Sequence, residues 1–278
     1  MFSVERMAKM LSVSKSGYYA FISRPLSRQK KERRHLDVLV KAAFESSQGR
    51  YGSWKISRAL AAKGTPYSRT RVADSMRRQT LRSKVRRKFV VTTDTKHTLK
   101  ASPNLLNREF QRDRPNKGWV SDITYLPSRA GWLYLAVFID LFSRRVVGWC
   151  VSPSLGHETV LVALSHAVWQ KRPNPGLMIH SDRGIQYCCE GFREAIHKNQ
   201  FVQSMSRKAN CWDNAVAESF FRSLKTEWLY HLDLIDLDHA KRELFAYIEM
   251  FYNNQRLHAY LDYVSPAAFE RLKTQKVA

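Results

Sequence analysis

Apolar residues recur at helical spacing along the first part of the chain. One face of residues 4–11 is apolar, which predicts a short helix. Residues 12–14 interrupt this pattern, and Ser14 can cap a second helix that Pro25 ends. Two short helices with basic flanks are compatible with helix-turn-helix DNA binding, and any small helical hairpin would give the same pattern.

A second helical region follows, over residues 33–82. Apolar spacing predicts three helices in it, the last of which begins at Ser68. The run over residues 77–88 has seven basic residues and no acidic one. Such a run is solvated or disordered when it binds nothing, but beside helical modules it indicates contact with a phosphate backbone. The predicted DNA contacts are Arg77, Arg78, Arg82, Lys84, Arg86, Arg87 and Lys88.

The pattern changes after residues 89–117, which lack periodicity and carry the Thr, Pro and Asn residues of a linker. Three β-rich runs with short breaks then predict an antiparallel meander, and helices and strands alternate after it. This order predicts an α/β fold, a mixed five-stranded sheet flanked by helices and preceded by a small all-α region. The predicted strands are 119–126, 132–139, 145–151, 177–180 and 201–204, and the predicted helices after the meander are 157–170, 191–199, 214–229 and 240–255.

Charge is distributed unevenly over the 278 residues. The net charge is +23, and residues 1–120 hold 29 basic and 8 acidic residues, so that the remainder is nearly neutral. A basic half beside a neutral half indicates a polyanion partner, with double-stranded DNA the leading candidate; the alternative is a basic protein with solvated charged faces. We predict a helix-turn-helix-like segment at 1–25, a basic DNA-binding domain at 26–88, a linker at 89–117 and a catalytic core with C-terminal helices at 118–278.

Composition excludes several classes of protein. Hydrophobic residues make up 44% of the chain, which is enough for a core and excludes wholesale disorder. No apolar run approaches the roughly 20 residues of a membrane helix, and the charged N-terminus is not a signal peptide. The four cysteines and nine histidines lack paired metal-ligand spacing. We therefore expect a reduced cytoplasmic chain with no disulfide framework, no structural zinc and no membrane partner.

Three carboxylates stand in or directly after apolar elements. Asp122 lies within a predicted strand, Asp182 follows the short strand LMIH, and Glu218 lies in the predicted helix 214–229. A charge in such a place costs several kcal/mol unless it is paired or bound to a metal. Asp140, at the end of the second strand, is a fourth candidate that composition alone does not reject.

The spacing of these residues carries a resemblance. Thirty-five residues separate Asp182 from Glu218, and Lys225 follows Glu218 by two helical turns. This arrangement resembles the D,D-35-E signature of retroviral integrases and related transposases. The segments WVSDITYLP, HSDRGIQY, NAVAESFFRSLKTE and YNNQRLHAYLDYVSPAAFE, together with RYGSWKISRALAAKG, are similar to insertion-sequence transposases of the IS-three family, in the part encoded by their second reading frame. The resemblance spans nearly the whole chain.

The resemblance implies an RNase H-like fold and a magnesium-dependent DNA transposase, with Mn²⁺ as a substitute metal. Asp122, Asp182 and Glu218 would be the catalytic and metal-binding residues of a two-metal site. Water would free a 3′-OH at the element's end, and that hydroxyl would then attack another phosphodiester. Lys225 would contact DNA phosphate; the alternative is a surface Lys that is solvated or paired with Glu227.

Other residues near these motifs have weaker assignments. His180 could contact substrate or orient its loop, but a lone His beside a strand is more often structural. Trp119 and Trp212 could stack on bases, with core packing favoured for Trp119. We expect Asn210, Asp213 and Asn214 to shape a loop and cap the helix of Glu218.

Two residues depart from the family pattern. Ile185 stands where a small polar residue is common, and Asp262 replaces a Gly of the C-terminal motif. The second change puts the geometry of that turn in doubt, because Gly is favoured where φ is positive.

The predicted partners are the ends of an insertion element, its target DNA, further copies of this chain on DNA, and the upstream reading-frame product. Two other functions stay open from the sequence. One is a metal-dependent nuclease that cuts without joining, and the other is a DNA-binding accessory or inhibitory product without catalysis of its own. Acting on DNA also predicts association with the bacterial nucleoid.

Overall fold

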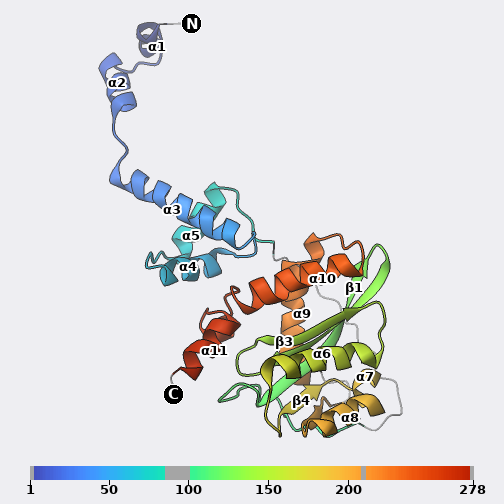
Figure 1. Cartoon of the computed structure of the whole chain (residues 1–278). Helices are drawn as coiled ribbons and strands as arrows, with labels where there is room; N and C mark the ends of the chain where they lie inside the picture. The colour runs from blue at the N-terminus through green and yellow to red at the C-terminus, as the bar shows by residue number, and fades with distance from the viewer. Residues whose placement is uncertain (1–2, 85–100, 208–210, 276–278) are drawn as a thin grey trace. The chain divides into compact units, whose positions relative to one another are not determined.

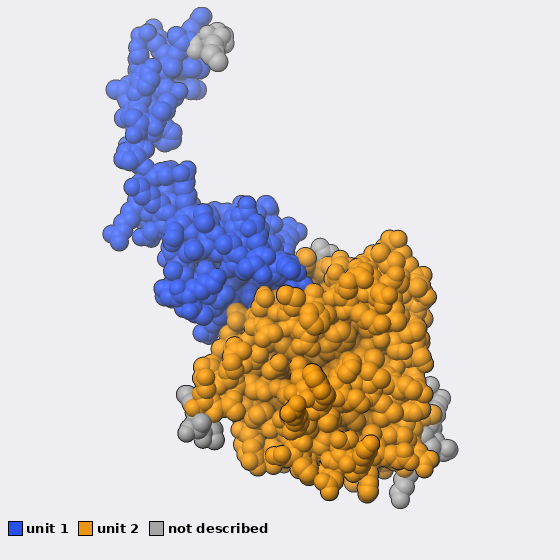
Figure 2. All heavy atoms as spheres, viewed as in Figure 1, with its two compact units in different colours: residues 1–83 blue, residues 84–278 orange. Residues whose placement is uncertain are grey.

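The computed structural model describes residues 3–84, 101–207 and 211–275. Its residues divide into two compact units, Met1–Ser83 and Lys84–Ala278 (Figure 2). We describe each unit by itself. In the described residues no helix is both long enough and apolar enough to cross a bilayer.

The first unit is all-helical, as predicted. Each predicted helix forms, and serine side chains cap four of the five by accepting a backbone N–H at the first turn. Buried apolar residues of α3, α4 and α5 pack into one small core that includes Leu36, Ile56 and Val72. The helices are α1 (Val4–Met10), α2 (Lys15–Ser23), α3 (Arg28–Ser46), α4 (Ser53–Ala62) and α5 (Arg69–Arg78).

The second unit contains a five-stranded mixed sheet, as the pattern predicted, and its strand order is β3-β2-β1-β4-β5. The first three strands form the antiparallel meander, and β4 and β5 run parallel to β1. The central strand is therefore β1. The strands are β1 (Gly118–Ser128), β2 (Gly131–Asp140), β3 (Val146–Ser152), β4 (Met178–Ser181) and β5 (Val202–Met205).

Helices cover the sheet (Figure 1). A cluster of buried apolar residues joins Trp119 and Phe138 of the sheet to α6 (His157–Lys171), α7 (Ile185–Cys188) and α8 (Glu190–Lys198). Helix α6 lies so close to β3 that a Cβ on Gly148 would stand 2.3 Å from the Ala163 carbonyl oxygen. That approach requires glycine. Helix α9 (Ala215–Glu227) packs on β1.

The C-terminal part differs from the prediction of one helix over 240–255. Helix α10 (Leu237–Phe245) continues into a π-helical segment, Ala246–Asn253. This wider segment places Asn253 against the edge strand, where its amide group both donates to and accepts from the backbone of Val146 at 3.0 Å. Short 3₁₀ segments at Cys211–Asn214, Leu229–His231 and Ala259–Leu261, and helix α11 (Pro266–Thr274), complete the unit.

The turn after Ala259–Leu261 has a positive φ at the position where Asp262 replaces the family's glycine. Asp262 has φ 52° and ψ 38°, which is left-handed backbone, and Tyr263 follows with φ 60°. Asp tolerates this region better than most side chains other than Gly and Asn. The turn geometry is therefore kept without the glycine.

The stretch before β1 is more ordered than the predicted linker, residues 89–117. Its described part packs on β5: the Leu105 N–H donates to the Ser204 hydroxyl at 2.9 Å, and the Met205 N–H donates to the Pro103 carbonyl at 3.2 Å. Leu106 is fully buried. These contacts are made by individual backbone groups and side chains and not by the regular hydrogen bonds of paired strands. The sequence therefore shows no periodicity there.

Candidate active site

Two of the predicted carboxylates lie side by side on neighbouring parallel strands, Asp122 within β1 and Asp182 directly after β4. The register of β1 and β4 pairs Gly118 with Met178 and Val120 with His180. Continuing that register by two residues sets Asp122 beside Asp182, which directly follows β4. Neighbouring strands lie about 4.8 Å apart, so the two residues lie side by side at the point where β4 ends.

Electrostatics identify Asp122 as the centre of the group. Burial raises the pKa of Asp122 well above its usual range, and the charges of Asp182 and Glu218 raise it further. The Ile123 N–H, which donates to Asp122 Oδ1 at 2.8 Å, and the ammonium of Lys225 act in the opposite direction. The structure thus brings all three predicted carboxylates and Lys225 into one charge network.

Helix α9 supplies the other two members of this network. Glu218 lies in its first turn with a partly exposed side chain, and the loss of solvent around its carboxyl group raises its pKa. Lys225 lies seven residues later on the same face, about 10.5 Å along the axis. Burial lowers the pKa of Lys225, and the charge of Asp122 raises it.

The alternative pairing of Lys225 with Glu227 is wrong. Glu227 is buried and binds Arg256 through both oxygens, with Nη2–Oε1 at 2.7 Å and Nε–Oε2 at 2.9 Å. The Tyr247 hydroxyl also donates to it at 3.2 Å. These partners stabilise the packing of α9 against the C-terminal segment.

The donor set suits a hard divalent cation. Carboxylate oxygens are the ligands that Mg²⁺ prefers, and a +2 ion would relieve the repulsion that raises the pKa of Asp122. Over the described ranges, no three His, Cys, Asp or Glu side chains converge as a ready-made ligand group. The fit therefore rests on donor chemistry and on the shared charge network of Asp122, Asp182 and Glu218.

Asp213 anchors the loop that leads into α9. Its carboxylate is fully buried and accepts from the Arg207 guanidinium at 2.8 and 3.0 Å, the Arg207 N–H at 2.9 Å, Arg108 Nε at 3.0 Å and Asn104 Nδ2 at 2.9 Å. The Arg207 hydrogen bond is the main reason why the pKa of Asp213 lies well below its usual range. Sequence reasoning anticipated a shaping role for Asp213 but missed Arg108 and Arg207, because those partners are distant or carry no periodic signal.

Asn214 stands at the N-cap position of α9, but its side chain makes no capping hydrogen bond. Its amide group instead donates to the Ser121 carbonyl of β1 at 3.2 Å. Asn214 therefore links α9 to β1 and does not cap the helix as expected. On the other side of β1, the Ser121 hydroxyl meets the buried Tyr187 hydroxyl at 2.9 Å. Asn210 lies outside the described residues.

His180 and Asp140 are structural residues. His180 is fully buried between the hydroxyls of Ser204 at 2.8 Å and Ser206 at 3.2 Å, and burial lowers its pKa to about 4. Asp140 accepts from the Asn116 N–H at 2.9 Å and from the N–H and hydroxyl of Ser143, both at 2.8 Å, which fixes the turn after β2.

Core packing is confirmed for Trp119, whereas base stacking by Trp212 stays a prediction. Trp119 is fully buried in the core, whereas Trp212 is 69% exposed beside the loop that Asp213 anchors.

The predicted DNA contacts at the end of α5 are partly engaged within the unit. Arg77 pairs with Asp74 at 2.9 Å and Arg78 with Asp37 at 2.6 Å. Arg82 lines a small pocket of the same unit. Lys84 is the last described residue before the gap, and Arg86, Arg87 and Lys88 lie outside the described residues.

Comparisons with known proteins agree with this architecture. Residues 112–211 and 218–273 match two models of the integrase core domain, and residues 30–89 match an HTH-like domain. The catalytic core domain of HTLV-2 integrase, solved in complex with magnesium, aligns with 56% of this chain and 96% of its own, at 17% identity and a TM-score of 0.42. The family-model matches define the chain as an integrase-core protein with an HTH-like domain.

Two relatives narrow the class. The chain is 40% identical over 271 residues to the transposase InsF for insertion sequence IS3A of Escherichia coli (strain K12), covering 97% of this chain and 94% of the relative. It is 39% identical over 272 residues to an uncharacterized 31 kDa protein of insertion element IS600 from Shigella sonnei, covering 98% and 100%. The chain belongs to the IS-three (IS3) family of insertion-sequence transposases.

Proposed function

We propose that this DNA transposase uses Asp122, Asp182 and Glu218 to hold Mg²⁺, with Mn²⁺ as a substitute, and acts on the ends of its own insertion element. The observation that carries the proposal is the charge network around Asp122, which the strand register sets beside Asp182, and in which Asp182, Glu218 and Lys225 all act on Asp122. Membership of the IS3 family supports the reaction class.

The proposed reaction has two displacements at phosphorus. Water first attacks the phosphodiester at the element's end and frees a 3′-OH, and that hydroxyl then attacks a target phosphodiester and joins the strands. Bound Mg²⁺ would supply Lewis acidity at the attacking and leaving oxygens. No covalent bond between enzyme and DNA forms, so the chemistry needs no Ser or Tyr nucleophile.

The chain's own residues position the substrate and the ligands. Ionised Asp122 and Asp182 would provide oxygen ligands from neighbouring strands, and Glu218 would provide a third from α9. Lys225 offers a phosphate contact on the same helix face and favours the ionised form of Asp122. The buried Asp213 cluster holds the start of α9 in place.

DNA holding belongs mainly to the first unit in this proposal. This unit has 19 basic and 5 acidic residues over 1–83, and the sequence from Arg77 to Lys88 has further basic residues beyond its end. We propose that several copies assemble on the two element ends, with the upstream reading-frame product as a further partner, at the nucleoid in the cytoplasm.

One assay separates the possible activities. Purified chain would receive end-labelled element DNA, a target plasmid and Mg²⁺, with EDTA as the control. Labelled DNA joined to the plasmid supports the transposase. Nicking without joining would indicate a nuclease, and binding without cleavage would indicate an accessory product that needs the upstream reading frame.

A further inference from the structure

Two arginines pack against the ring of an exposed tryptophan on α4. Trp54 is 46% exposed, although the core of α3–α5 lies directly beneath its helix. The guanidinium carbons of Arg58 and Arg69 each lie 5.5 Å from the centre of its ring. Arg58 follows Trp54 by one helical turn, and Arg69 is the first residue of α5. Two helices therefore build one surface cluster from an indole and two cations, which we call the Trp54 cluster.

Cation–π packing orients these arginines without cancelling their charge. A guanidinium beside an aromatic ring loses conformational freedom, yet its N–H groups can still meet phosphate oxygens. Neighbouring pairs extend the arrangement, with Lys55 Nζ 5.1 Å from the Tyr51 ring and the Arg71 guanidinium 5.0 Å from the Tyr67 ring. The α4–α5 surface thus has ordered cations next to flat rings.

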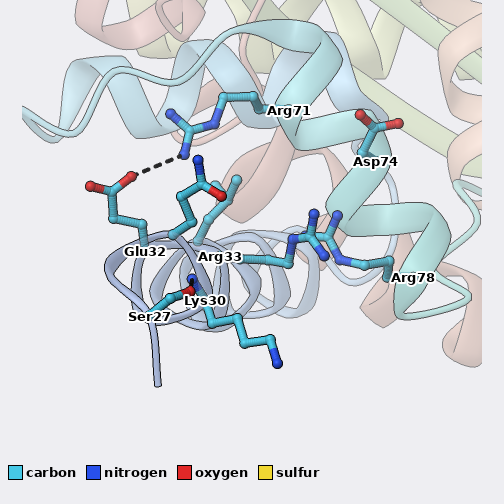
Figure 3. Close-up of a pocket in the computed structure, with 9 residues that line it drawn as sticks. Ser27, Lys30, Glu32, Arg33, Arg71, Asp74 and Arg78 are labelled. Atoms are coloured by element: carbon cyan, nitrogen blue, oxygen red, sulfur yellow. Dashed lines mark hydrogen bonds and ion pairs between the residues drawn. The ribbon is translucent and has the colours of Figure 1, made fainter. Parts of the chain in front are cut away.

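The other arginines of α5 have acidic neighbours. A pocket of about 550 Å³ between α3 and α5 contains Arg71 and Arg78, and Figure 3 shows Arg71 extending toward Glu32, 3.8 Å away. Arg78 binds Asp37 at 2.6 Å, and Arg77 binds Asp74 at 2.9 Å.

Arg69 differs from these arginines. Within the described parts of the chain it pairs with no carboxylate, and its contact is the Trp54 ring. Its full charge is therefore available to an anionic ligand.

The cluster lies on two helices joined by a short connection, within the residues that match the HTH-like domain. Residues 63–68 connect α4 to α5, with Gly64 at φ 79° and the Ser68 hydroxyl capping α5 at the Arg71 N–H. In helix-turn-helix proteins the second helix of the pair enters the groove by its N-terminal residues, while nearby side chains contact the backbone. Arg69 lies at that N-terminus and Arg58 on the preceding helix.

We propose that Trp54, Arg58 and Arg69 form a binding site for the phosphate backbone of duplex DNA and place the N-terminus of α5 against a groove. The inference rests on DNA being the substrate under the proposed function. It assigns the main phosphate contact of the described first unit to the start of α5 rather than to Arg77 and Arg78 at its end. The excess of basic residues in this unit supports a polyanionic ligand.

Fluorescence anisotropy with a labelled duplex of arbitrary sequence tests this site on the full chain, in EDTA so that no cleavage occurs. Arg58→Gln and Arg69→Gln should each weaken binding roughly tenfold at low salt. Each should also lower the slope of log affinity against log salt by about 0.9, and the double variant by about twice that. Arg28→Gln is the matched control, because Arg28 is exposed in the same unit and lies beside Glu32 at 3.4 Å.

Further variants separate charge from orientation. Trp54→Leu keeps both cations, so it should lose affinity with little change in slope, whereas Trp54→Phe should keep most of the affinity because it retains a ring. Thermal melting checks that each variant folds. If the Gln double variant is unstable, a variant with both arginines replaced by Lys is used, because it keeps the charge. The slope should then stay near wild type while affinity falls, since Lys lacks the planar fork.

An unchanged slope in the Gln double variant, or an equal loss in Arg28→Gln, would overturn the inference. A change confined to oligomer mass would also overturn it, since that would make the cluster a protein contact. Strand joining by the wild-type chain is measured separately. If the wild-type chain fails to join DNA but the Gln double variant has a reduced slope, only the proposed reaction is contradicted. If the wild-type chain joins DNA but the slope of the double variant is unchanged, only the role of the Trp54 cluster is contradicted.

Discussion

Burial and two neighbouring carboxylates make the position of Asp122 unfavourable for a charge, which fits its proposed role as a metal ligand. It lies on the central strand, where burial and the nearby Asp182 and Glu218 all favour the protonated form. A divalent cation reverses this balance by stabilising the ionised carboxylates. Cation binding should therefore release protons and weaken as the pH falls.

Lys225 gives a prediction at the same scale. Lys225→Ala should slow joining by roughly tenfold and weaken binding to element ends. Because the ammonium lowers the pKa of Asp122, its loss should also raise that pKa and move the acid limb of the rate profile to higher pH. Lys225→Arg should restore much of the rate and the profile. Strand-transfer rates across pH measure this, and a wild-type profile in Lys225→Ala would make Lys225 an ordinary surface charge.

Some of the site could be read from single residues and some could not. Asp122 and Asp182 interrupt or terminate apolar strands, so their positions alone marked them. The partners of Asp213 left no such signal, because Arg108 is 105 residues away and one arginine among 47 basic residues is not distinctive. The role of Asn214 was also unpredictable, since its acceptor is a backbone carbonyl on β1.

Elements with a strong period were predictable, and those held by irregular contacts were not. The meander of β1 to β3 and helix α6 follow directly from their apolar patterns. Residues 101–110 instead contact β5 and Asp213 through individual side chains and backbone groups. The π-helical segment Ala246–Asn253 depends on the fit of Asn253 to the edge strand, which no local pattern encodes.

The Asp213 cluster predicts a coupling between that irregular segment and α9. Asp213→Asn should destabilise the second unit by about 2 kcal/mol, because it removes the charge with which this buried carboxylate binds Arg207 and Arg108, whose side chains are about half exposed. Since the folded-state pKa of Asp213 is lowered, its contribution is present above the unfolded pKa of about 3.9 and is lost as the pH falls below it. The difference in stability between wild type and variant should therefore shrink in acid.

Urea unfolding from neutral pH to about pH 3 measures this difference. Asp233→Asn serves as the control, because Asp233 also binds an arginine, Arg129, but both side chains are exposed. A constant difference between Asp213→Asn and wild type at all pH values would contradict the assignment.

At the scale of the whole molecule, the excess of basic residues lies in the first unit, whereas the proposed metal ligands lie in the second. Residues 1–84 hold 20 basic and 5 acidic residues, whereas residues 101–278 hold 22 and 18. A fragment of residues 1–84 should bind duplex DNA with a steep salt dependence, with a slope of about 0.9 per phosphate neutralised. A fragment of residues 101–278 should bind far more weakly. Equal affinities at moderate salt, measured by anisotropy, would refute this division.

Strand transfer by carboxylate variants tests the central claim most directly. Asp122→Asn, Asp182→Asn and Glu218→Gln each remove one proposed ligand with little change in volume, whereas Asp238→Asn changes an exposed carboxylate in α10. We expect joining and cleavage to fall below about 1% of wild type in the first three, with DNA binding intact, and to stay normal in Asp238→Asn. Substantial Mg²⁺-dependent joining by any of the three would contradict the account and remove that residue from the site.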